Sequence, residues 1–214
     1  MEKTEGITLK SIEFREHQRI ITVMTKDHGI ISLIASRLGS KNYRLLNLTS
    51  PLTCGEFVFK PGKTDLWRFI DGSILDLHAP IRQELGKLQA AQSMLKRMHT
   101  TQLPQKPAPA LYQLLKSFLS RLKTTTVPET LLTAFTLKFL RHEGLLSIKT
   151  TCGHCAAPDS FRFHEGDNYC AACAPFGSIA LTPDEWQQMI HLLASRSFEA
   201  LESLPINDQI KRLC

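Results

Sequence analysis

Four of the six cysteines in this 214-residue chain form two closely spaced pairs, Cys152 with Cys155 and Cys170 with Cys173. Two residues lie between the cysteines of each pair, which lets both sulfurs face one ion, and fourteen residues separate the pairs. Two such pairs complete the tetrahedron of ligands that zinc prefers. The spacing therefore predicts a four-cysteine metal site holding one zinc ion per chain.

The predicted metal site is structural, because four thiolates fill the coordination shell and a catalytic zinc usually keeps one position open for water. Three alternatives stay open: a histidine ligand from His154 or His164, a redox role for one CxxC pair, and iron in the same four-sulfur site. We expect Gly153 to let the backbone of the first pair turn tightly. Cys54 is expected to be a buried thiol, and Cys214 has no obvious partner.

Common catalytic and nucleotide-binding motifs are absent from the sequence. No GxxxxGK[ST], HExxH, GxSxG or GxGxxG pattern occurs. The eight histidines are scattered without the spacing of a ligand pair, and the adjacent Asp184 and Glu185 are explained by the start of a helix. We therefore predict that the protein is not an enzyme.

Composition indicates a soluble globular protein, with 43% hydrophobic and 21% charged residues. No apolar run approaches the ~18 residues that a membrane span requires, so no membrane role is expected. The first residues, MEKTEG, lack the apolar core of a secretory signal, which predicts a cytoplasmic location. In that reducing compartment, paired cysteines favour a metal over a disulfide.

Charge is unevenly distributed along the chain. Residues 1–80 carry 11 basic and 9 acidic side chains, residues 81–150 carry 11 and 3, and residues 151–214 carry 4 and 8, giving net charges of +2, +8 and −4. A basic segment can steer a polyanion toward one face of a protein. A solvated, lysine-rich helical surface explains the same pattern equally well.

The N-terminal third contains five short β-rich runs. They are residues 6–12, 18–25, 29–36, 54–60 and 66–76. Polar residues ending in Gly29 suit a hairpin loop between the second and third runs. Five strands this close together predict a small closed barrel, because closure removes exposed sheet edges. Alternating aromatic side chains are expected mainly to fill the barrel core, with stacking on bases as the alternative; they are Phe57, Phe59, Trp67 and Phe69.

Beyond Pro80 the apolar residues follow a helical period. The pattern predicts helices over residues 81–98, 111–122, 128–144 and 182–196. Gly144 is expected to end the third helix, and Thr182 with Glu185 to form a capping box at the start of the fourth. The fold class is therefore α+β: an OB-fold barrel at 1–79, then a helical domain at 80–214 with the zinc module at about 150–176.

Basic residues near the barrel are candidates for nucleic-acid contacts. Arg37, Lys41 and Arg44 are expected in the loop after the third strand. The grooves of OB folds pair such cations with aromatic stacking surfaces. Cations of this kind neutralise phosphates without reading bases.

Residues 4–40, TEGITLKSIEFREHQRIITVMTKDHGIISLIASRLGS, resemble the opening of the bacterial RecO recombination mediators. The resemblance rests on the early TEGI, on Glu16 and Arg19 before a strand, and on the hairpin that ends at Gly29. The order of barrel, helical domain and four-cysteine module is also similar, so the resemblance spans nearly the whole chain.

The RecO resemblance implies a DNA repair and recombination protein without a catalytic centre. Such a protein binds single- and double-stranded DNA, anneals complementary strands, and helps a recombinase replace single-strand-binding protein. The implied partners are RecR, the acidic C-terminal tail of single-strand-binding protein and, indirectly, the recombinase. By the same resemblance Arg37, Lys41 and Arg44 contact DNA, Arg19 either contacts DNA or supports the fold, and the metal braces the helical domain. The +8 segment would extend the DNA path or receive the acidic tail.

Two other functions stay open from the sequence. One is a zinc-braced protein-interaction adaptor that does not itself anneal DNA. The other is a metal-dependent enzyme, which would lose substrate turnover on metal removal while its fold survived.

Overall fold

The computed structural model describes residues 1–36, 43–149, 151–158 and 160–211. Arg37 and Lys41 therefore lie outside the described residues. The chain forms two compact units, Met1–Thr126 and Val127–Cys214. The predicted domain boundary between residues 79 and 80 lies close to the point where the strands end and the helices begin. That the two domains divide there stays a prediction.

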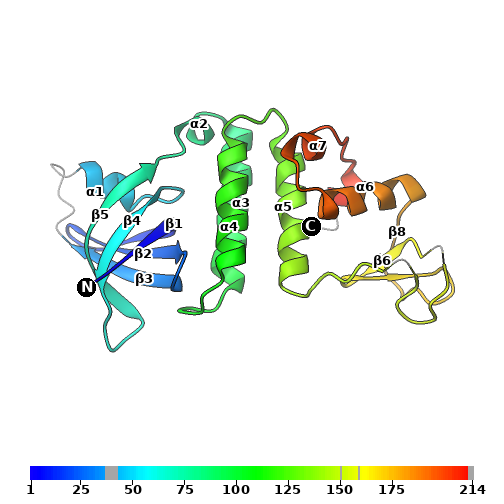
Figure 1. The fold of residues 1–214 in the computed structure, drawn as a ribbon, viewed down its shortest axis with the longest axis horizontal. Helices are drawn as coiled ribbons and strands as arrows, with labels where there is room; N and C mark the ends of the chain where they lie inside the picture. The colour runs from blue at the N-terminus through cyan, green and yellow to red at the C-terminus, as the bar shows by residue number, and fades with distance from the viewer. Residues whose placement is uncertain (37–42, 150, 159, 212–214) are drawn as a thin grey trace. The chain divides into compact units, whose positions relative to one another are not determined.

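The first unit contains a closed five-stranded barrel (Figure 1). Its strands are β1 (Glu2–Arg15), β2 (Gln18–Thr25), β3 (Gly29–Ser36), β4 (Cys54–Lys60) and β5 (Leu66–Asp76). They follow one another around the barrel in the order β1-β2-β3-β5-β4, with β3 and β5 parallel and β1 returning to β4. The predicted barrel is confirmed, and this is the strand order of an OB fold. The first strand is longer than predicted at both ends.

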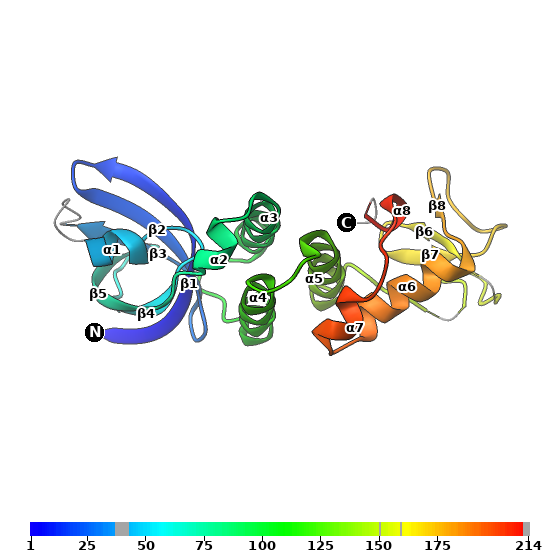
Figure 2. The ribbon, with the colours of Figure 1, turned by 90° about the horizontal axis from the view of Figure 1, so that it is seen from above.

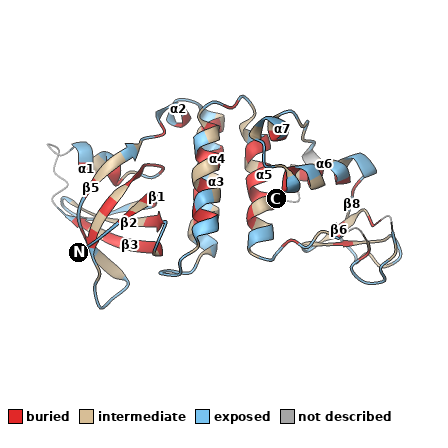
Figure 3. Ribbon diagram, in the orientation of Figure 1, coloured by how far each residue is buried: buried red, intermediate tan, exposed pale blue. Residues whose placement is uncertain are grey.

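Aromatic and branched side chains fill the barrel. Phe57, Phe59 and Phe69 are buried, and Trp67 packs partly buried against them. The prediction that these alternating aromatics form the core is therefore confirmed. Figure 3 shows buried stretches along the barrel strands.

A short helix that the sequence pattern did not predict, α1 (Tyr43–Leu48), covers one end of the barrel core. Its Leu45 and Leu48 are buried in the same cluster as the barrel aromatics. A side chain at Gly55 or Gly72 would collide with Leu48. These two glycines therefore allow the helix to approach the strands closely.

Three further helices belong to the first unit: α2 (Ala79–Arg82), α3 (Leu85–Thr101) and α4 (Pro109–Leu122). The single helix predicted over residues 81–98 is wrong at its start, because Glu84 has an extended backbone that separates α2 from α3. Helices α3 and α4 lie side by side in Figures 1 and 2. Their apolar faces are buried, as the period predicted.

The second unit is built on α5 (Pro128–His142) and α6 (Pro183–Ala194), with the short helices α7 (Phe198–Glu202) and α8 (Asp208–Lys211). Gly144 has a φ of +72°, which confirms the predicted end of α5. The predicted capping box of Thr182 and Glu185 is present at the start of α6. Within the described ranges, none of the helices combines the length and apolar character needed to cross a bilayer.

Between α5 and α6 lies a small module with three short strands. These are β6 (Arg162–His164), β7 (Asp167–Tyr169) and β8 (Ile179–Ala180), in the order β7-β6-β8. In this segment the sequence predicts the cysteine ligands and a tight turn, but no strands. The strands are two or three residues long, so they show no alternation that a pattern could reveal.

Candidate metal centre and nucleic-acid interface

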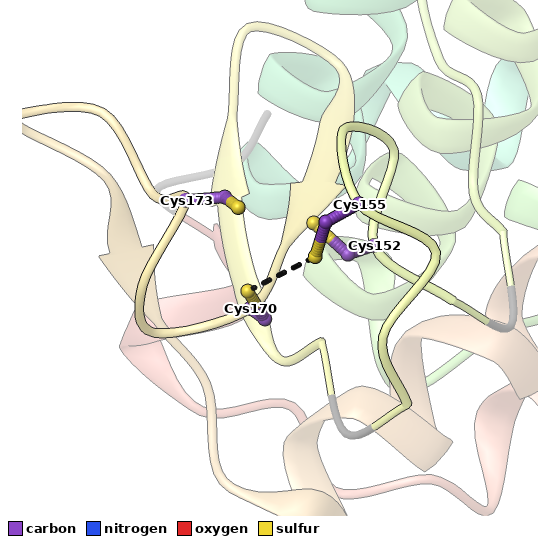
Figure 4. A group of neighbouring side chains, drawn as sticks. All are labelled: Cys152, Cys155, Cys170 and Cys173. Atoms are coloured by element: carbon purple, nitrogen blue, oxygen red, sulfur yellow. Dashed lines mark hydrogen bonds between the residues drawn. The ribbon is translucent and has the colours of Figure 1, made fainter.

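The four paired cysteines converge on one point (Figure 4). The sulfurs of Cys152, Cys155, Cys170 and Cys173 all lie within 4.8 Å of one another. The Cys155 and Cys170 sulfurs are 3.7 Å apart, and a tetrahedral ion with metal–sulfur bonds of about 2.3 Å would place its ligands about 3.8 Å apart. All four cysteines are free thiols. The group could therefore hold a metal ion.

Backbone turns shape each cysteine pair. The Ala156 N–H donates to the Cys152 carbonyl at 3.0 Å, and the Ala174 N–H donates to the Cys170 carbonyl at 3.1 Å. The left-handed residue of the first turn is Ala156, with a φ of 59°. Gly153 was expected to allow a tight turn, but its role is to allow close packing: a Cβ there would lie 3.3 Å from the Asn168 carbonyl oxygen.

The thiol pKa values of the four-cysteine cluster are shifted in opposite directions. Hydrogen bonds from the backbone N–H groups of Cys155 and Cys170 lower the pKa of the Cys152 thiol to about 6. The backbone N–H of Cys173 likewise lowers the pKa of the Cys170 thiol. In contrast, the neighbouring thiol groups of Cys155 and Cys170 raise the pKa of Cys173 to about 12. A cation between the sulfurs would remove the repulsion that keeps Cys173 protonated.

Asn168 on β7 organises the module and was not singled out from the sequence. Its side chain is buried, accepts a hydrogen bond from the Lys149 N–H at 2.9 Å, and donates one to the Thr151 carbonyl at 2.9 Å. Its own carbonyl accepts from the Gly153 N–H at 2.9 Å. This residue therefore ties the first cysteine pair to the strand leading into the second. An asparagine in a turn-rich segment carries no distinctive sequence signal.

The two histidines considered as rival ligands occupy different places. The Nδ1 atom of His154 lies 3.6 Å from the Cys173 sulfur, beside the cluster. His164 on β6 lies 3.9 Å from the exposed carboxylate of Glu165 instead. Cys54 is buried in the barrel, and burial raises the pKa of its thiol to about 11, as suits a buried thiol. Cys214 is outside the described residues.

Arg44, a candidate for DNA contact, lies on α1 and not in a loop. Its guanidinium donates to the Asp71 carboxylate on β5 at 2.8 Å, and both side chains are 56% exposed. Such an exposed pair is weak, so a phosphate can compete for the arginine. Arg37 and Lys41 belong to the undescribed segment just before α1.

Arg19, the fourth candidate, lies on β2 opposite Glu13 of β1. The two side chains form an ion pair of 3.4 Å, in which Arg19 is 26% exposed and Glu13 is 84% exposed. The structure therefore places Arg19 in the β1–β2 hairpin, on a different element from Arg44.

Several cations of the +8 segment make contacts inside their own unit. Lys116 pairs with Glu5 at 2.5 Å and Lys123 with Asp76 at 2.7 Å, which joins α4 and its C-terminal end to the barrel strands. Lys138 donates to two backbone carbonyls near the end of α6. Part of this positive charge is therefore compensated by structural contacts, which no count of residues could reveal.

Family models match both parts of the chain. The model described as "Recombination protein O N terminal" matches residues 1–78, and "Recombination protein O C terminal" matches residues 82–214. The first match covers the barrel, and the second covers the helices and the cysteine module.

Curated relatives of this chain carry the name "DNA repair protein RecO". The protein of Bacillus pumilus is 28% identical over 167 residues, which is 78% of this chain and 65% of the relative. The protein of Chlamydia trachomatis serovar D is 25% identical over 192 residues, or 88% of this chain and 79% of the relative. The protein of Syntrophus aciditrophicus is 25% identical over 178 residues, or 80% and 69%.

Proposed function

This chain belongs to the RecO family of DNA repair proteins, and we propose that it acts as a recombination mediator that binds single- and double-stranded DNA. In this role it anneals complementary strands and assists loading of a recombinase onto strands covered by single-strand-binding protein. The proposal places it in the cytoplasm, where such DNA is found and where the four thiols stay reduced.

The observation that carries this proposal is the closed barrel with the OB strand order, at the residues matched by the RecO N-terminal model. OB folds bind oligonucleotides through the face of strands 2 and 3 and the loops around it. The proposed DNA contacts are Arg37, Lys41, Arg44 and Arg19. These cations would screen repulsion between two phosphate backbones and leave base edges free to pair.

We assign the four cysteines to one structural zinc ion, supported by their convergence and by the N–H groups that favour thiolates. Bound zinc would supply folding energy by cross-linking the two cysteine pairs. The protein has no enzymatic role in this proposal, because four thiolate ligands leave no position for water or substrate.

The proposed protein partners are RecR and the acidic tail of single-strand-binding protein, with the recombinase engaged indirectly. A pocket of about 330 Å³ in the second unit suits an acidic tail. Ile190 and Leu193 of α6 and Ile148 provide its apolar walls, and the exposed Arg141 of α5 provides a cation at its edge. An acidic peptide with an apolar side chain would match both features.

Titration of a labelled single strand at several salt concentrations tests this proposal. Log affinity should fall with log salt by about 0.7 for each phosphate contact. Little affinity at moderate salt would contradict direct DNA binding.

The second candidate, a zinc-braced protein adaptor, is favoured by Phe176, whose side chain is fully exposed. Phe176 lies in a turn closed by the Ser178 N–H donating to the Pro175 carbonyl at 3.1 Å, close to Cys173. An aromatic residue held out on a braced turn is a typical anchor for a protein partner. The same salt titration separates the two functions, since an adaptor needs no affinity for DNA.

A further inference from the structure

The end of β1 carries an exposed aromatic ring beyond the buried part of the barrel. Residues 12–15 are all exposed, whereas residues 6–9 of the same strand are buried. Phe14 is 49% exposed. A phenyl ring is among the most favourable groups to bury, so an exposed one at the edge of a candidate nucleic-acid surface suggests a partner with an apolar face.

Backbone geometry sets Phe14 apart from its neighbours. Glu13 is paired with Arg19, but Arg15 is paired with Gln18, so the register shifts by one residue at Phe14. This irregularity is a β-bulge, a feature that re-aims a side chain and is common at barrel rims and near functional sites.

A hollow of about 340 Å³ adjoins the Phe14 ring. The β1–β2 hairpin forms most of its lining, and Leu46 of α1 completes it. The Arg15 guanidinium lies over the ring, 5.2 Å from its centroid. This volume is at the small end of the ~300–1,000 Å³ range for small-molecule sites, which suits one planar group.

The hairpin carries no net charge when His17 is neutral. Arg15 and Arg19 are balanced by Glu13, which pairs with Arg19, and by Glu16, which lies 3.7 Å from His17. The hollow itself therefore has little net charge, and stacking on Phe14 is the interaction that the hairpin adds to the phosphate contact proposed for Arg19.

We propose that this hollow is a nucleobase subsite, in which one unpaired base stacks on the Phe14 ring that the Arg15 guanidinium also contacts. The inference rests on the proposed DNA binding and adds a residue that favours single strands over duplex. Bases in a duplex are already stacked on each other, whereas those of a single strand expose their faces. Because every base has such a face, the subsite tolerates any sequence.

Phe14→Ala in the full chain tests the subsite, with Ile12→Ala as a matched control because Ile12 is also 49% exposed on β1. The probes are a labelled oligo(dT) of about 20 nucleotides, an abasic strand of the same length and a duplex. Phe14→Ala should weaken oligo(dT) binding roughly tenfold with an unchanged salt slope, because it removes stacking and no phosphate contact. Binding of the abasic strand and the duplex should be unchanged, as should all binding by Ile12→Ala.

Phe14→Trp provides a direct readout, since a stacked base quenches indole fluorescence. Oligo(dT) should quench this variant beyond the change seen in the unaltered chain, which already contains Trp67 and Trp186. Equal oligo(dT) affinity for Phe14→Ala and the unaltered chain, or an equal loss with the abasic strand, would overturn the subsite alone. Absence of DNA binding by the unaltered chain would overturn the proposed function as well.

Discussion

At the scale of single residues, the charge on the cysteine cluster indicates that a bound cation would stabilise it. Four sulfurs within 4.8 Å of one another cannot all be thiolates unless a positive ion lies among them. The pKa of Cys152 is lowered to about 6 and that of Cys173 is raised to about 12, so the metal-free cluster is only partly ionised at neutral pH. Metal binding must therefore release protons, and its affinity should rise with pH.

Cys152→Ser and Cys173→Ser should each lower the zinc content from one ion per chain and reduce the melting temperature. Each replacement removes a ligand that no other cysteine in the described residues is placed to supply. Cys54→Ala is the control, since Cys54 is buried in the barrel and should keep full zinc content when replaced. Metal analysis and thermal melting measure both effects; unchanged melting of metal-free protein would exclude a structural role.

The ion pair between Arg44 and Asp71 should limit how strongly Arg44 binds a DNA phosphate. Asp71→Asn should strengthen single-strand binding up to about fivefold, because it frees Arg44 and removes a carboxylate that repels phosphate. Arg44→Glu should weaken binding and reduce the salt slope by about 0.7. Glu56→Gln removes the partner of Lys3 in another exposed pair on the barrel and should change affinity less. Equal gains for Asp71→Asn and Glu56→Gln would show that only net charge matters.

At the scale of elements, Asn168 holds the cysteine module together. Asn168→Ala would leave the Lys149 N–H and the Thr151 carbonyl without their partner, at about 1–3 kcal/mol for each group that stays buried. We expect weaker zinc retention against a chelator and a lower melting temperature. Asn47→Ala, at an exposed asparagine of α1, should change neither. Zinc retention equal to that of the unaltered chain would show that Asn168 does not hold the cysteine module together.

Glu5 joins β1 to α4 inside the first unit. Its Oε1 accepts hydrogen bonds from the Tyr112 hydroxyl and the Lys116 ammonium, each at 2.5 Å. Burial alone would raise the pKa of Glu5, but these two donors outweigh it and hold the pKa below the ordinary value of 4.5. A carboxyl with a lowered pKa stabilises the fold above its ordinary value and loses that contribution as the pH falls through the folded value.

Glu5→Gln should therefore lower the free energy of unfolding by about 1–3 kcal/mol at neutral pH. The difference from the unaltered chain should shrink as the pH falls from 4.5 through the lower pKa of the folded state, because the unfolded chain takes up this proton first and the native carboxyl follows. Denaturant titrations across this pH range measure it. Glu16→Gln, at a glutamate that is 91% exposed, is the control and should show no such trend.

The local signals for strands and long helices in this sequence are strong, which is why the barrel and α4 to α6 could be predicted. Alternation over seven or more residues and capping residues such as Thr182 depend on near neighbours. In contrast, α1 has six residues and is held by contacts of Leu45 and Leu48 with distant strands. The two residues of the break between α2 and α3, Gln83 and Glu84, are neither glycine nor proline.

The candidate sites show the same division between local and distant information. The cysteine ligands could be found because two residues between cysteines bring both sulfurs to one ion whatever surrounds them. The Phe14 bulge, the Asn168 anchor and the pairing of Arg44 with Asp71 depend on register and on residues far apart in the chain. The spacing of residues along the sequence does not indicate such contacts.

At the scale of the whole molecule, the two units contribute different properties. The first unit combines the barrel, its cations and an exposed aromatic ring, and the second contains the cysteine cluster and a pocket lined by both aliphatic side chains and Arg141. The protein carries a net charge of +6, which favours association with a polyanion. We infer that the metal stabilises the scaffold and that the barrel contacts the strands.

The central claim is that the protein accelerates annealing of complementary strands. The most direct test measures annealing of two labelled oligonucleotides at low salt, with energy transfer between the labels as the readout. The purified zinc-loaded chain should accelerate duplex formation over the protein-free reaction, and the acceleration should fade as salt rises because phosphate contacts carry it. The variant Arg44→Glu should accelerate annealing less than the unaltered chain. A rate equal to the protein-free reaction at low salt would contradict the proposed role as an annealing mediator.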